Sequence, residues 1–595
     1  MEFRGSTRRL GPPFVAVLAA LVALGLAVAE RVRAQEAPAV ATAAPVALPT
    51  PPAPLASAEA AGAPATSPAA SASPPALASP AGATPPATPS SPGASAAPGS
   101  PGPTSLEPTP PPIIVDPPQA GVTPGGSVRL RVMQELGSLS VTVADPAIVD
   151  ASVDQVAREI VVRGKKLGAT TLTVTDARGM TRDVAVRVAF PAGTVAEAAS
   201  VRITGNPATQ LFVREQARAA ALAAATLRPG ASVVASTDSI GVNAPLRVDD
   251  VTTVDVPVIV AGDGFFTVQG TTHVRVENFA QPPLAPRSLL VSDFPERLTE
   301  NGILFTADIS AKQGQRFLYY HYNPSGQPDR RIVLKVRNPS PQPALVQFIS
   351  GSAGPDGNEM LVGHASTQRF LVRRAQNEGT VVSIPGNATI ALAEQALPAK
   401  SLVSALMQLN EIQGPPLHLT LVAQNASDPV DGPIPQSALL AGDRPHARGV
   451  YPIPEFFFDY SYDANGPDLE VPIGQIPLPN LVEGQTLAGD YGVLQSVTLR
   501  IVNDDRRNAR QIALYANPRG GRATGTFVID RVLVQAHQMA PFGHYKLRQY
   551  TVPPGSFIRT EIVTMPEGGS SYPLRLVLAP DDGSAAPGSG DSPIY

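Results

Sequence analysis

The chain contains no cysteine and no tryptophan, and each absence narrows the kinds of protein it can be. Without cysteine it has no disulfide and no thiolate, so every folded part must be held together by its own hydrophobic core. Without tryptophan, and with aromatic residues at only 5%, it is poorly equipped for a carbohydrate platform of exposed indole rings. Its 595 residues exceed one ordinary domain and predict several.

Signals for chemistry and for charged partners are also scarce. The formal net charge is only -4, and the charges are mixed along the chain, so neither nucleic acid nor an anionic membrane surface is an expected partner. The 7 histidines never stand at the H-x-H, H-x-x-x-H or H-E-x-x-H spacing of metal ligands. No G-x-S-x-G elbow, phosphate-binding loop or Rossmann fingerprint is present. We therefore predict no enzyme, no catalytic residues, no cofactor and no metal.

The N-terminal segment predicts export. Arg4, Arg8 and Arg9 precede an uncharged apolar run from Phe14 to Ala29. This run has the length of the apolar core of a signal peptide and is short for a membrane span of about 20 residues. Small residues suited to cleavage follow, so we predict a signal peptide over 1–34 and a periplasmic or cell-surface protein. One alternative is an uncleaved anchor, which would be the only expected membrane contact. The other alternative is a twin-arginine export signal.

A segment rich in alanine, proline and serine follows over 35–112. It has almost no large apolar residues, so it cannot bury enough surface to offset the entropy of ordering, and we predict that it is disordered. Its proline content favours extended, semi-stiff conformations. It is either a stalk that carries the folded part away from a membrane or a linker without a specific role.

Residues 113–190 predict a small all-β domain. In GGSVRLRV, valine and leucine alternate with arginine, as in a half-buried strand. Asp145-Pro146 ends the next alternating segment, and Gly164 and Gly168 bracket a tight connection. The turn DARG then leads into a closing valine-rich strand.

The same stretch carries an ordered set of motifs. Gly126 precedes a strand, V-x-V-x-D-P-x-I runs from Val141 to Ile148, and G-K-x-x-G-x-T-x-L-x-V-x-D-x-x-G runs from Gly164 to Gly179. With the closing V-x-V at 186–188, residues 124–188 resemble the pilus-formation protein N-terminal domain, which precedes the secretin channel of tight-adherence (Flp-type) pilus systems. No secretin channel domain follows here. The resemblance therefore implies a scaffold or accessory of pilus or secretion machinery and not the pore.

A bacterial immunoglobulin-like repeat of surface adhesins is the alternative for this module, because it uses a similar D-P-x-I-V strand and a G-x-x-T-x-x-V closing segment. Such repeats usually carry a tryptophan or an asparagine-rich turn before the acidic element. Residues 135–143 have neither feature, so the pilus-type module is favoured.

Residues 191–284 predict a strand-helix unit with further strands. Asn206-Pro207 precedes LFVREQARAAALAAATLR, an alanine-rich helix that Pro229-Gly230 ends, and strands are expected at 253–260 and 267–276. Units of this kind build ring-stacking domains of secretion assemblies, so an oligomer is one interpretation. The other is a helix that covers a sheet edge or one end of a sandwich.

The C-terminal half predicts a duplicated immunoglobulin-like β-sandwich, with copies at 285–427 and 450–582, a linker at 428–449 and a disordered tail at 583–595. Three pairs of segments share an order of strands and turns: Arg330–Ser350 with Ser496–Ala516, Val381–Pro398 with Tyr550–Pro566, and Pro416–Ala423 with Pro573–Pro580. The first copy has an insertion, Leu397–Ile412, whose LVSALMQL is expected to form a short helix.

Four residues are candidates for binding a ligand. Tyr319 and His321 share one face of the strand in FLYYHYNPSG, where aromatic packing across a sheet is the favoured interpretation. His537 and His544 flank Met-Ala-Pro, and a turn there could bring them together around copper or zinc. His364 is expected in a loop.

The fold class predicted is therefore mainly β and multidomain: a small β module, a strand-helix unit and two immunoglobulin-like sandwiches behind a disordered N-terminal segment. The predicted function is an exported structural or assembly protein of the cell envelope that binds pilus or secretion proteins through sheet edges, with a homo-oligomer possible. A surface adhesin or ligand-binding protein is the alternative.

Overall fold

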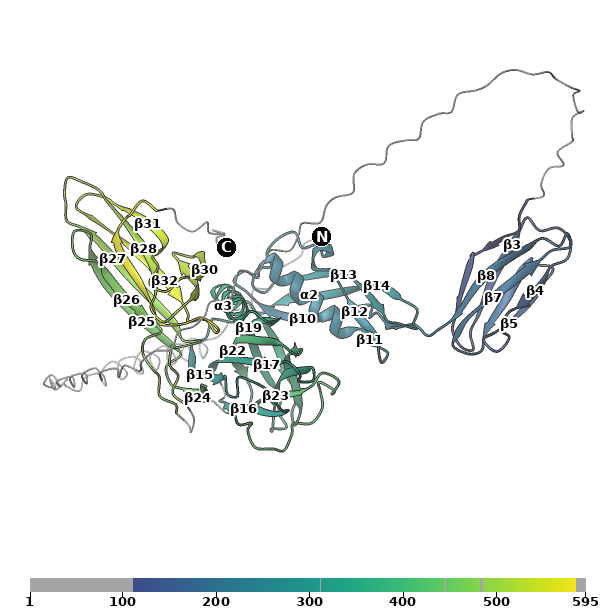
Figure 1. Ribbon diagram of the computed structural model, residues 1–595, viewed down its shortest axis with the longest axis horizontal. Helices are drawn as coiled ribbons and strands as arrows, with labels where there is room; N and C mark the ends of the chain where they lie inside the picture. Colours follow the sequence, from purple (N-terminus) through teal and green to yellow (C-terminus); the bar gives the residue numbers. More distant parts are fainter. Residues whose placement is uncertain (1–110, 311, 443–445, 482–484, 585–595) are drawn as a thin grey trace, which may run out of the picture. The chain divides into compact units, whose positions relative to one another are not determined.

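The computed structural model describes residues 111–310, 312–442, 446–481 and 485–584 (Figure 1). All the described residues belong to one compact unit. The predicted signal peptide, nearly all of the segment over 35–112 and most of the tail over 583–595 lie outside the described residues. The described part is mainly β, as predicted. None of its helices is both long enough and apolar enough to cross a membrane.

The first module is a sandwich of two four-stranded sheets, with the orders β1-β3-β6-β5 and β2-β8-β7-β4. Apolar side chains at alternate positions meet between the sheets, where Leu130, Ile160 and Leu172 are fully buried. The alternation in the sequence therefore predicts this core correctly. The strands are β1 (Ile114–Asp116), β2 (Gln119–Val122), β3 (Ser127–Met133), β4 (Ser140–Val143), β5 (Val149–Asp154), β6 (Glu159–Gly164), β7 (Gly168–Thr175) and β8 (Thr181–Val188).

The predicted alanine-rich helix is α2 (Gln210–Ala224), and it begins where the Thr209 hydroxyl accepts a hydrogen bond from the Phe212 N–H at 3.3 Å. Its small and apolar face, including Phe212, Val213 and Ala217, packs on β10, β13 and β14. The strands expected at 253–260 and 267–276 are β13 and β14. The remaining elements are β9 (Gly193–Thr194), β10 (Ala198–Thr204), β11 (Thr226–Leu227), β12 (Ser232–Val234), the 3-10 turn η1 (Thr237–Ser239), β13 (Val251–Ala261) and β14 (Val268–Asn278).

This unit shares a sheet with the sandwich that follows it. β10 pairs in parallel with β14 on one side and antiparallel with β20 on the other, which gives a ten-stranded sheet in the order β12-β13-β14-β10-β20-β19-β22-β17-β15-β24. The sequence analysis treats the two parts as adjacent units, whereas the backbone hydrogen bonds continue from one to the other.

Two sandwiches of the same topology fill the rest of the described chain. We call β15 to β23 sandwich copy 1 and β25 to β33 sandwich copy 2. Copy 1 uses β15 (Pro286–Ser292), β16 (Gly302–Ile309), β17 (Gly314–Asn323), β18 (Arg330–Arg337), β19 (Ala344–Asp356), β20 (Gly379–Ile384), β21 (Thr389–Leu397), β22 (Ser401–Gln413) and β23 (Leu417–Asn425). Copy 2 uses β25 (Glu455–Asp463), β26 (Leu469–Ile473), β27 (Leu494–Asn503), β28 (Arg510–Pro518), β29 (Ala523–Ile529), β30 (Val532–Met539), β31 (Tyr545–Val552), β32 (Ser556–Thr564) and β33 (Leu574–Pro580).

The two copies match strand for strand. The orders β15-β17-β22-β19-β20 and β16-β23-β18-β21 in copy 1 correspond to β25-β27-β32-β29-β30 and β26-β33-β28-β31 in copy 2. Even the parallel pair at one edge recurs, as β15 with β17 and β25 with β27. The predicted duplication is therefore present in the topology, and α3 (Glu359–Ala375) is an insertion between β19 and β20 of copy 1.

The alignment of the copies from sequence needs one correction. Arg330–Ser350 contains β18 and the start of β19, but the segment matched to it, Ser496–Ala516, contains β27 and β28. The first and second pairs of segments are therefore each out of register by one strand. The third pair, β23 with β33, is matched correctly. An alternating strand, a polar turn and another strand recur at every hairpin, so this pattern does not determine which hairpin matches which.

A buried asparagine marks the correct alignment. Asn323, at the end of β17, donates from Nδ2 to the carbonyl oxygen of Leu397 at 3.0 Å. Asn503, at the end of β27, donates from Nδ2 to the carbonyl oxygen of Val552 at 3.2 Å. Each amide also donates to the carbonyl oxygen five residues later, at 2.9 Å in both copies. The two side chains thus join equivalent strand ends in the two copies.

Replacing Asn503 by alanine is expected to lower the stability of copy 2 by about 1–3 kcal/mol, because buried carbonyl oxygens lose their donor. Differential scanning calorimetry of the whole chain, with each transition assigned by hydrogen exchange, measures the change. Asn465→Ala is the control, since Asn465 lies in an exposed turn. If both variants shift the same transition equally, the hydrogen bonds of the Asn503 side chain do not stabilise copy 2.

Two local predictions are wrong. Residues 397–412 are neither an insertion nor a helix, because LVSALMQL lies in β22, which corresponds to β32 of copy 2. β22 is the central strand between β19 and β17, and both of its faces are buried. A short, uninterrupted apolar segment fits a buried strand as well as a helix. His364 does not lie in a loop but inside α3, whose first turn is capped by the Asn358 side chain. The buried face of α3 is partly polar, which hides its helical periodicity.

Candidate functional site

The junction between the two sandwich copies is built around α3. This helix packs on β19 and β22 of copy 1 and contacts β29 of copy 2 (Figure 1). Gly363 allows a close approach of the two backbones, because a Cβ atom there would lie 1.6 Å from the carbonyl oxygen of Gly568 in copy 2. Only a residue without a side chain permits this contact.

A buried polar cluster crosses the junction beside Gly363. His364 of α3 faces two residues of copy 2, with Nδ1 at 2.9 Å from Glu567 Oε2 and Nε2 at 3.0 Å from Gln535 Oε1. The Thr526 hydroxyl donates to Glu567 Oε1 at 2.6 Å, and the Thr524 hydroxyl donates to Glu567 Oε2. Glu567 is fully buried, and these hydrogen bonds satisfy both of its carboxylate oxygens.

The surroundings shift the pKa values of the two histidines in this cluster in opposite directions. Burial lowers the pKa of His364, but the hydrogen bond and negative charge of Glu567, with a hydrogen bond to Gln535, outweigh it and leave that pKa raised. The ring of His537 packs edge-on against His364 with a centroid distance of 4.5 Å. Burial and then the positive charge of His364 lower the pKa of His537. Of the two histidines, His364 therefore binds a proton more readily.

A second link joins copy 1 to the start of β25. Arg316, fully buried on β17, donates to the Pro454 carbonyl oxygen at 2.6 Å and to Glu455 Oε1 at 2.7 Å. Arg374 of α3 donates to the same Glu455 oxygen at 3.1 Å. Burial and then the Arg374 charge lower the pKa of Arg316 to about 10, against the opposing effect of Glu455. These contacts fix the first residues of β25.

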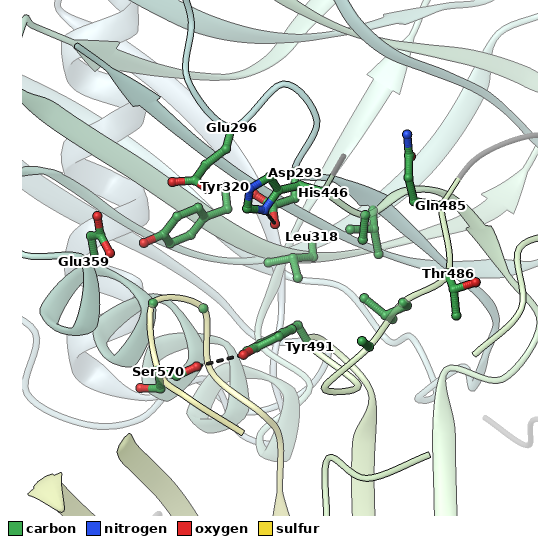
Figure 2. Close-up of a pocket in the computed structure, with 16 residues that line it drawn as sticks. Asp293, Glu296, Leu318, Tyr320, Glu359, His446, Gln485, Thr486, Tyr491 and Ser570 are labelled. Atoms are coloured by element: carbon green, nitrogen blue, oxygen red, sulfur yellow. Dashed lines mark hydrogen bonds and ion pairs between the residues drawn. The ribbon is translucent and has the colours of Figure 1, made fainter. Parts of the chain in front are cut away.

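A cavity of about 700 Å³ opens at the same junction (Figure 2). Copy 1 contributes residues in and after β15, residues of β17 and the first residue of α3. Copy 2 contributes 485–488, Tyr491 and 568–570, and the segment before copy 2 contributes His446 and Ala447. The Tyr491 hydroxyl donates to the Ser570 carbonyl oxygen at 2.8 Å across the copy 2 wall. The Tyr320 hydroxyl, on the copy 1 wall, has no hydrogen-bond partner among the described residues although the residue is only 8% exposed.

Three ionisable side chains meet on the wall of this cavity. His446 Nε2 lies 3.1 Å from Glu296 Oε2, and His446 Nδ1 lies 3.5 Å from Asp293 Oδ2. Asp293 follows β15 and His446 precedes β24 (Arg448–Tyr451), and these two strands pair antiparallel. The Asp293 N–H donates to the Ala447 carbonyl oxygen at 2.9 Å. Burial raises the pKa of Asp293 to about 6, although the nearby His446 opposes this shift.

The residues predicted from sequence lie elsewhere. Tyr319 and His321 share a face of β17, as predicted, with ring centroids 6.3 Å apart, but both are fully buried. His321 Nδ1 donates to the Pro295 carbonyl oxygen at 2.9 Å, and Nε2 accepts from the Ser292 hydroxyl at 3.1 Å. Burial lowers the pKa of His321 to about 4, so it is a neutral core residue at pH 7.

His537 and His544 contact different neighbours. His537 packs against His364, whereas the ring of His544 packs against Tyr515 with a centroid distance of 5.8 Å. The cluster of Asp293, Glu296 and His446 is not predicted from the sequence. Only the spacing of the two carboxylates, in DFPE, is visible in the sequence. Nothing local to His446 indicates that the pairing of β15 with β24 brings it to them.

The two sandwich copies differ at one sheet edge. In copy 1 the edge strand β15 is covered by β24, with Leu289 opposite Tyr451 and Ser292 opposite Arg448. In copy 2 the equivalent strand, β25, pairs only with β27 among the described residues. Phe457 projects from β25 with 75% of its surface exposed. On the other side of this strand, the rings at 456, 458 and 460 form a ladder with spacings of 5.9 and 6.3 Å.

No curated protein matches the chain. Solved structures that resemble part of it include the S-layer protein SbsC, domains 5-6, at 16% identity, with 28% of this chain and 96% of that chain covered and a TM-score of 0.13. Fibronectin(III)-like modules of Clostridium thermocellum CbhA match at 15% identity over 28% of this chain and 94% of theirs, with a TM-score of 0.15. Tandem Ig repeats of Dlar match at 9% identity over 28% and 99%, with a TM-score of 0.12. Likenesses this low carry no conclusion about function.

One comparison bears directly on the first module. The family described as "Pilus formation protein N terminal region" matches residues 118–189, which run from just before β2 to the end of β8. This range contains all the motifs from Gly126 to the closing V-x-V strand on which the resemblance depends. The predicted resemblance is confirmed: residues 118–189 of this chain match the model of the pilus formation protein N-terminal region.

Proposed function

We propose that this chain is an exported, non-enzymatic structural protein of the cell envelope that serves pilus or secretion machinery as a scaffold or accessory. The match of residues 118–189 to the pilus formation family supports this choice of partners. The apolar N-terminal run, followed by residues suited to signal cleavage, supports a periplasmic or cell-surface location. Two immunoglobulin-like sandwiches after the pilus-type module fit a protein that binds other proteins.

The open edge of β25 is the proposed binding surface, and the duplication carries this proposal. Copy 1 demonstrates that this edge of the sandwich accepts an added antiparallel strand, because β24 occupies it at β15. Copy 2 has the same strand order but no strand added at β25 in the described chain. An extended segment of an envelope partner would pair there by β-augmentation, with main-chain hydrogen bonds as the source of affinity.

Contacts with copy 1 fix the start of this edge strand before any partner binds. Arg316 and Arg374 hold Glu455 at the start of β25, so the strand begins from a fixed position. An ordered edge loses little entropy on binding, which improves affinity. Phe457 would pack against a side chain of the added strand, since aromatic residues are frequent hot spots in protein interfaces.

Replacing Phe457 by lysine is expected to weaken capture of the envelope partner at least about tenfold, because lysine on an edge strand opposes strand addition and the aromatic contact is lost. The measurement is quantitative affinity purification of the whole chain from envelope extracts. Phe542→Lys is the matched control, since Phe542 lies in the same copy and is 65% exposed.

Equal capture by both variants would exclude β25 as the binding surface. Recovery of no pilus or secretion component by the unmodified chain would count against the assembly role as a whole. Binding of glycans or host components instead would favour the adhesin alternative.

A further inference from the structure

The cluster of Asp293, Glu296 and His446 has the geometry of a metal site. Each residue can offer one ligand atom, and the three atoms lie within 4.8 Å of one another. Tetrahedral zinc with bonds of about 2.1 Å needs ligand atoms about 3.4 Å apart, so only a small contraction is required. The side chains keep exposures of 27% for Asp293, 24% for Glu296 and 38% for His446, so an ion can reach them from the cavity.

Polar groups beside the cluster lack partners. Asp293 Oδ1 is buried and accepts no hydrogen bond in the described chain. The Tyr320 hydroxyl on the same wall is also buried without a partner there, and the residue is only 8% exposed. Buried polar atoms are nearly always paired, so two unpaired ones lining one cavity indicate that a ligand or bound water completes the site.

The charge of the cavity favours a cation. Its described lining contains three carboxylates, Asp293, Glu296 and Glu359, but no lysine or arginine. The nearest arginine on β24, Arg448, donates instead to the carbonyl oxygens of Phe294 and Leu440, at 3.2 and 2.6 Å. Even with His446 protonated, the lining carries an excess of negative charge, and a divalent cation would relieve the repulsion.

We propose that Asp293, Glu296 and His446 bind a divalent transition metal, with zinc the best fit. Two carboxylate oxygens and one imidazole nitrogen suit zinc better than calcium or magnesium, which prefer oxygen ligands alone. One of the two ring nitrogens of His446 would bind the ion, together with one carboxylate oxygen each of Asp293 and Glu296. Three protein ligands leave a fourth position open to the cavity.

The metal would stabilise the connection between the copies. Asp293 and Glu296 follow β15 of copy 1, whereas His446 belongs to the segment that leads through β24 into copy 2. An ion held by both segments would lock β24 onto the edge of copy 1. This inference is independent of the proposed partner at β25, because the metal would act at the β15 edge of copy 1 and the partner at the β25 edge of copy 2.

Zinc titration into the whole chain tests this site, with any affinity tag removed and metal stripped by a chelator. Isothermal titration calorimetry is expected to show one site, and His446→Gln or Glu296→Gln should each weaken it at least about tenfold. Zinc should also raise the melting temperature of the unmodified chain but not that of the variants. His418→Gln is the matched control, because His418 forms an exposed pair with Asp308 at 2.8 Å and should bind zinc as the unmodified chain does.

Two results would overturn the proposal. If the unmodified chain binds no zinc, the cluster is only a polar contact of His446 with two carboxylates. If His446→Gln and Glu296→Gln bind zinc as tightly as the unmodified chain, the metal lies elsewhere. Should His446→Gln fail to fold, Glu296→Gln decides the question, because its smaller chemical change keeps the size of the side chain.

Discussion

Replacing Gly363 by alanine is expected to separate the two sandwich copies at their junction. Intrinsic helix propensity predicts the opposite sign, because alanine inside a helix is more favourable than glycine by about 1 kcal/mol. The added Cβ, however, would lie 1.6 Å from the Gly568 carbonyl oxygen, which belongs to backbone and cannot rotate away. Moving α3 or the 568–570 segment to relieve this overlap costs about 3 kcal/mol, so the steric effect prevails.

Hydrogen exchange across α3 and residues 565–571 measures this effect, and we expect faster exchange in both segments together with loss of the His364–Glu567 pair. Gly241→Ala is the control, because no atom lies within 4 Å of a Cβ built there. An unchanged or more stable Gly363→Ala protein would mean that the copies do not approach each other as closely as described.

Much of the fold can be predicted from local patterns. Alternation of valine and arginine in GGSVRLRV predicts a strand with one buried face, and Leu130 and Val132 are indeed buried while the arginines face solvent. The alanine-rich segment predicts α2 through its helix propensity, and the structure adds that Ala217 and Ala221 lie on the buried face. Patterns of this kind depend on residues that are close in the sequence.

Other elements depend on partners far along the chain. The buried face of α3 includes the polar residues His364 and Ser366, which bond to Glu567 and Ser404 far along the chain, and these contacts are not visible in the sequence. The apolar run in β22 is a strand because β17 and β19 lie on either side of it. Local propensity is a weak guide where such contacts decide the outcome.

The candidate site is hidden for the same reason. Asp293 and His446 are brought together only because β15 and β24 pair across the long connection between the copies. The four residues chosen from sequence stand out because aromatic residues and histidines are rare in this chain. The rarity of a residue type does not indicate whether its side chain is buried or exposed. Tyr319 and His321 are core residues with satisfied polar atoms, which a strand pattern cannot distinguish from an exposed patch.

Replacing Glu567 by alanine is expected to destabilise the junction by about 3–5 kcal/mol, the usual cost of removing one partner from a buried ion pair. His364 would lose the carboxylate at 2.9 Å, and the Thr524 and Thr526 hydroxyls would lose their acceptor. Calorimetry of the whole chain measures the loss. Glu394→Ala is the control, because Glu394 is 52% exposed in its pair with Arg331 and such surface pairs contribute about 1 kcal/mol or less.

The pH dependence gives this prediction a second, independent measurement. The pKa of His364 in the folded chain is raised above its ordinary value of 6.5, so the ion pair contributes fully below pH 6.5 and its contribution is lost as the pH rises through the folded pKa. The stability difference between the unmodified chain and Glu567→Ala should therefore be largest near pH 6 and shrink at alkaline pH. His537, whose pKa is lowered, has the opposite dependence, and its stabilising effect is lost as the pH falls through that lowered value. A difference that stays constant from pH 6 to pH 9 would mean that Glu567 acts as a packing and hydrogen-bonding group, with His364 neutral beside it.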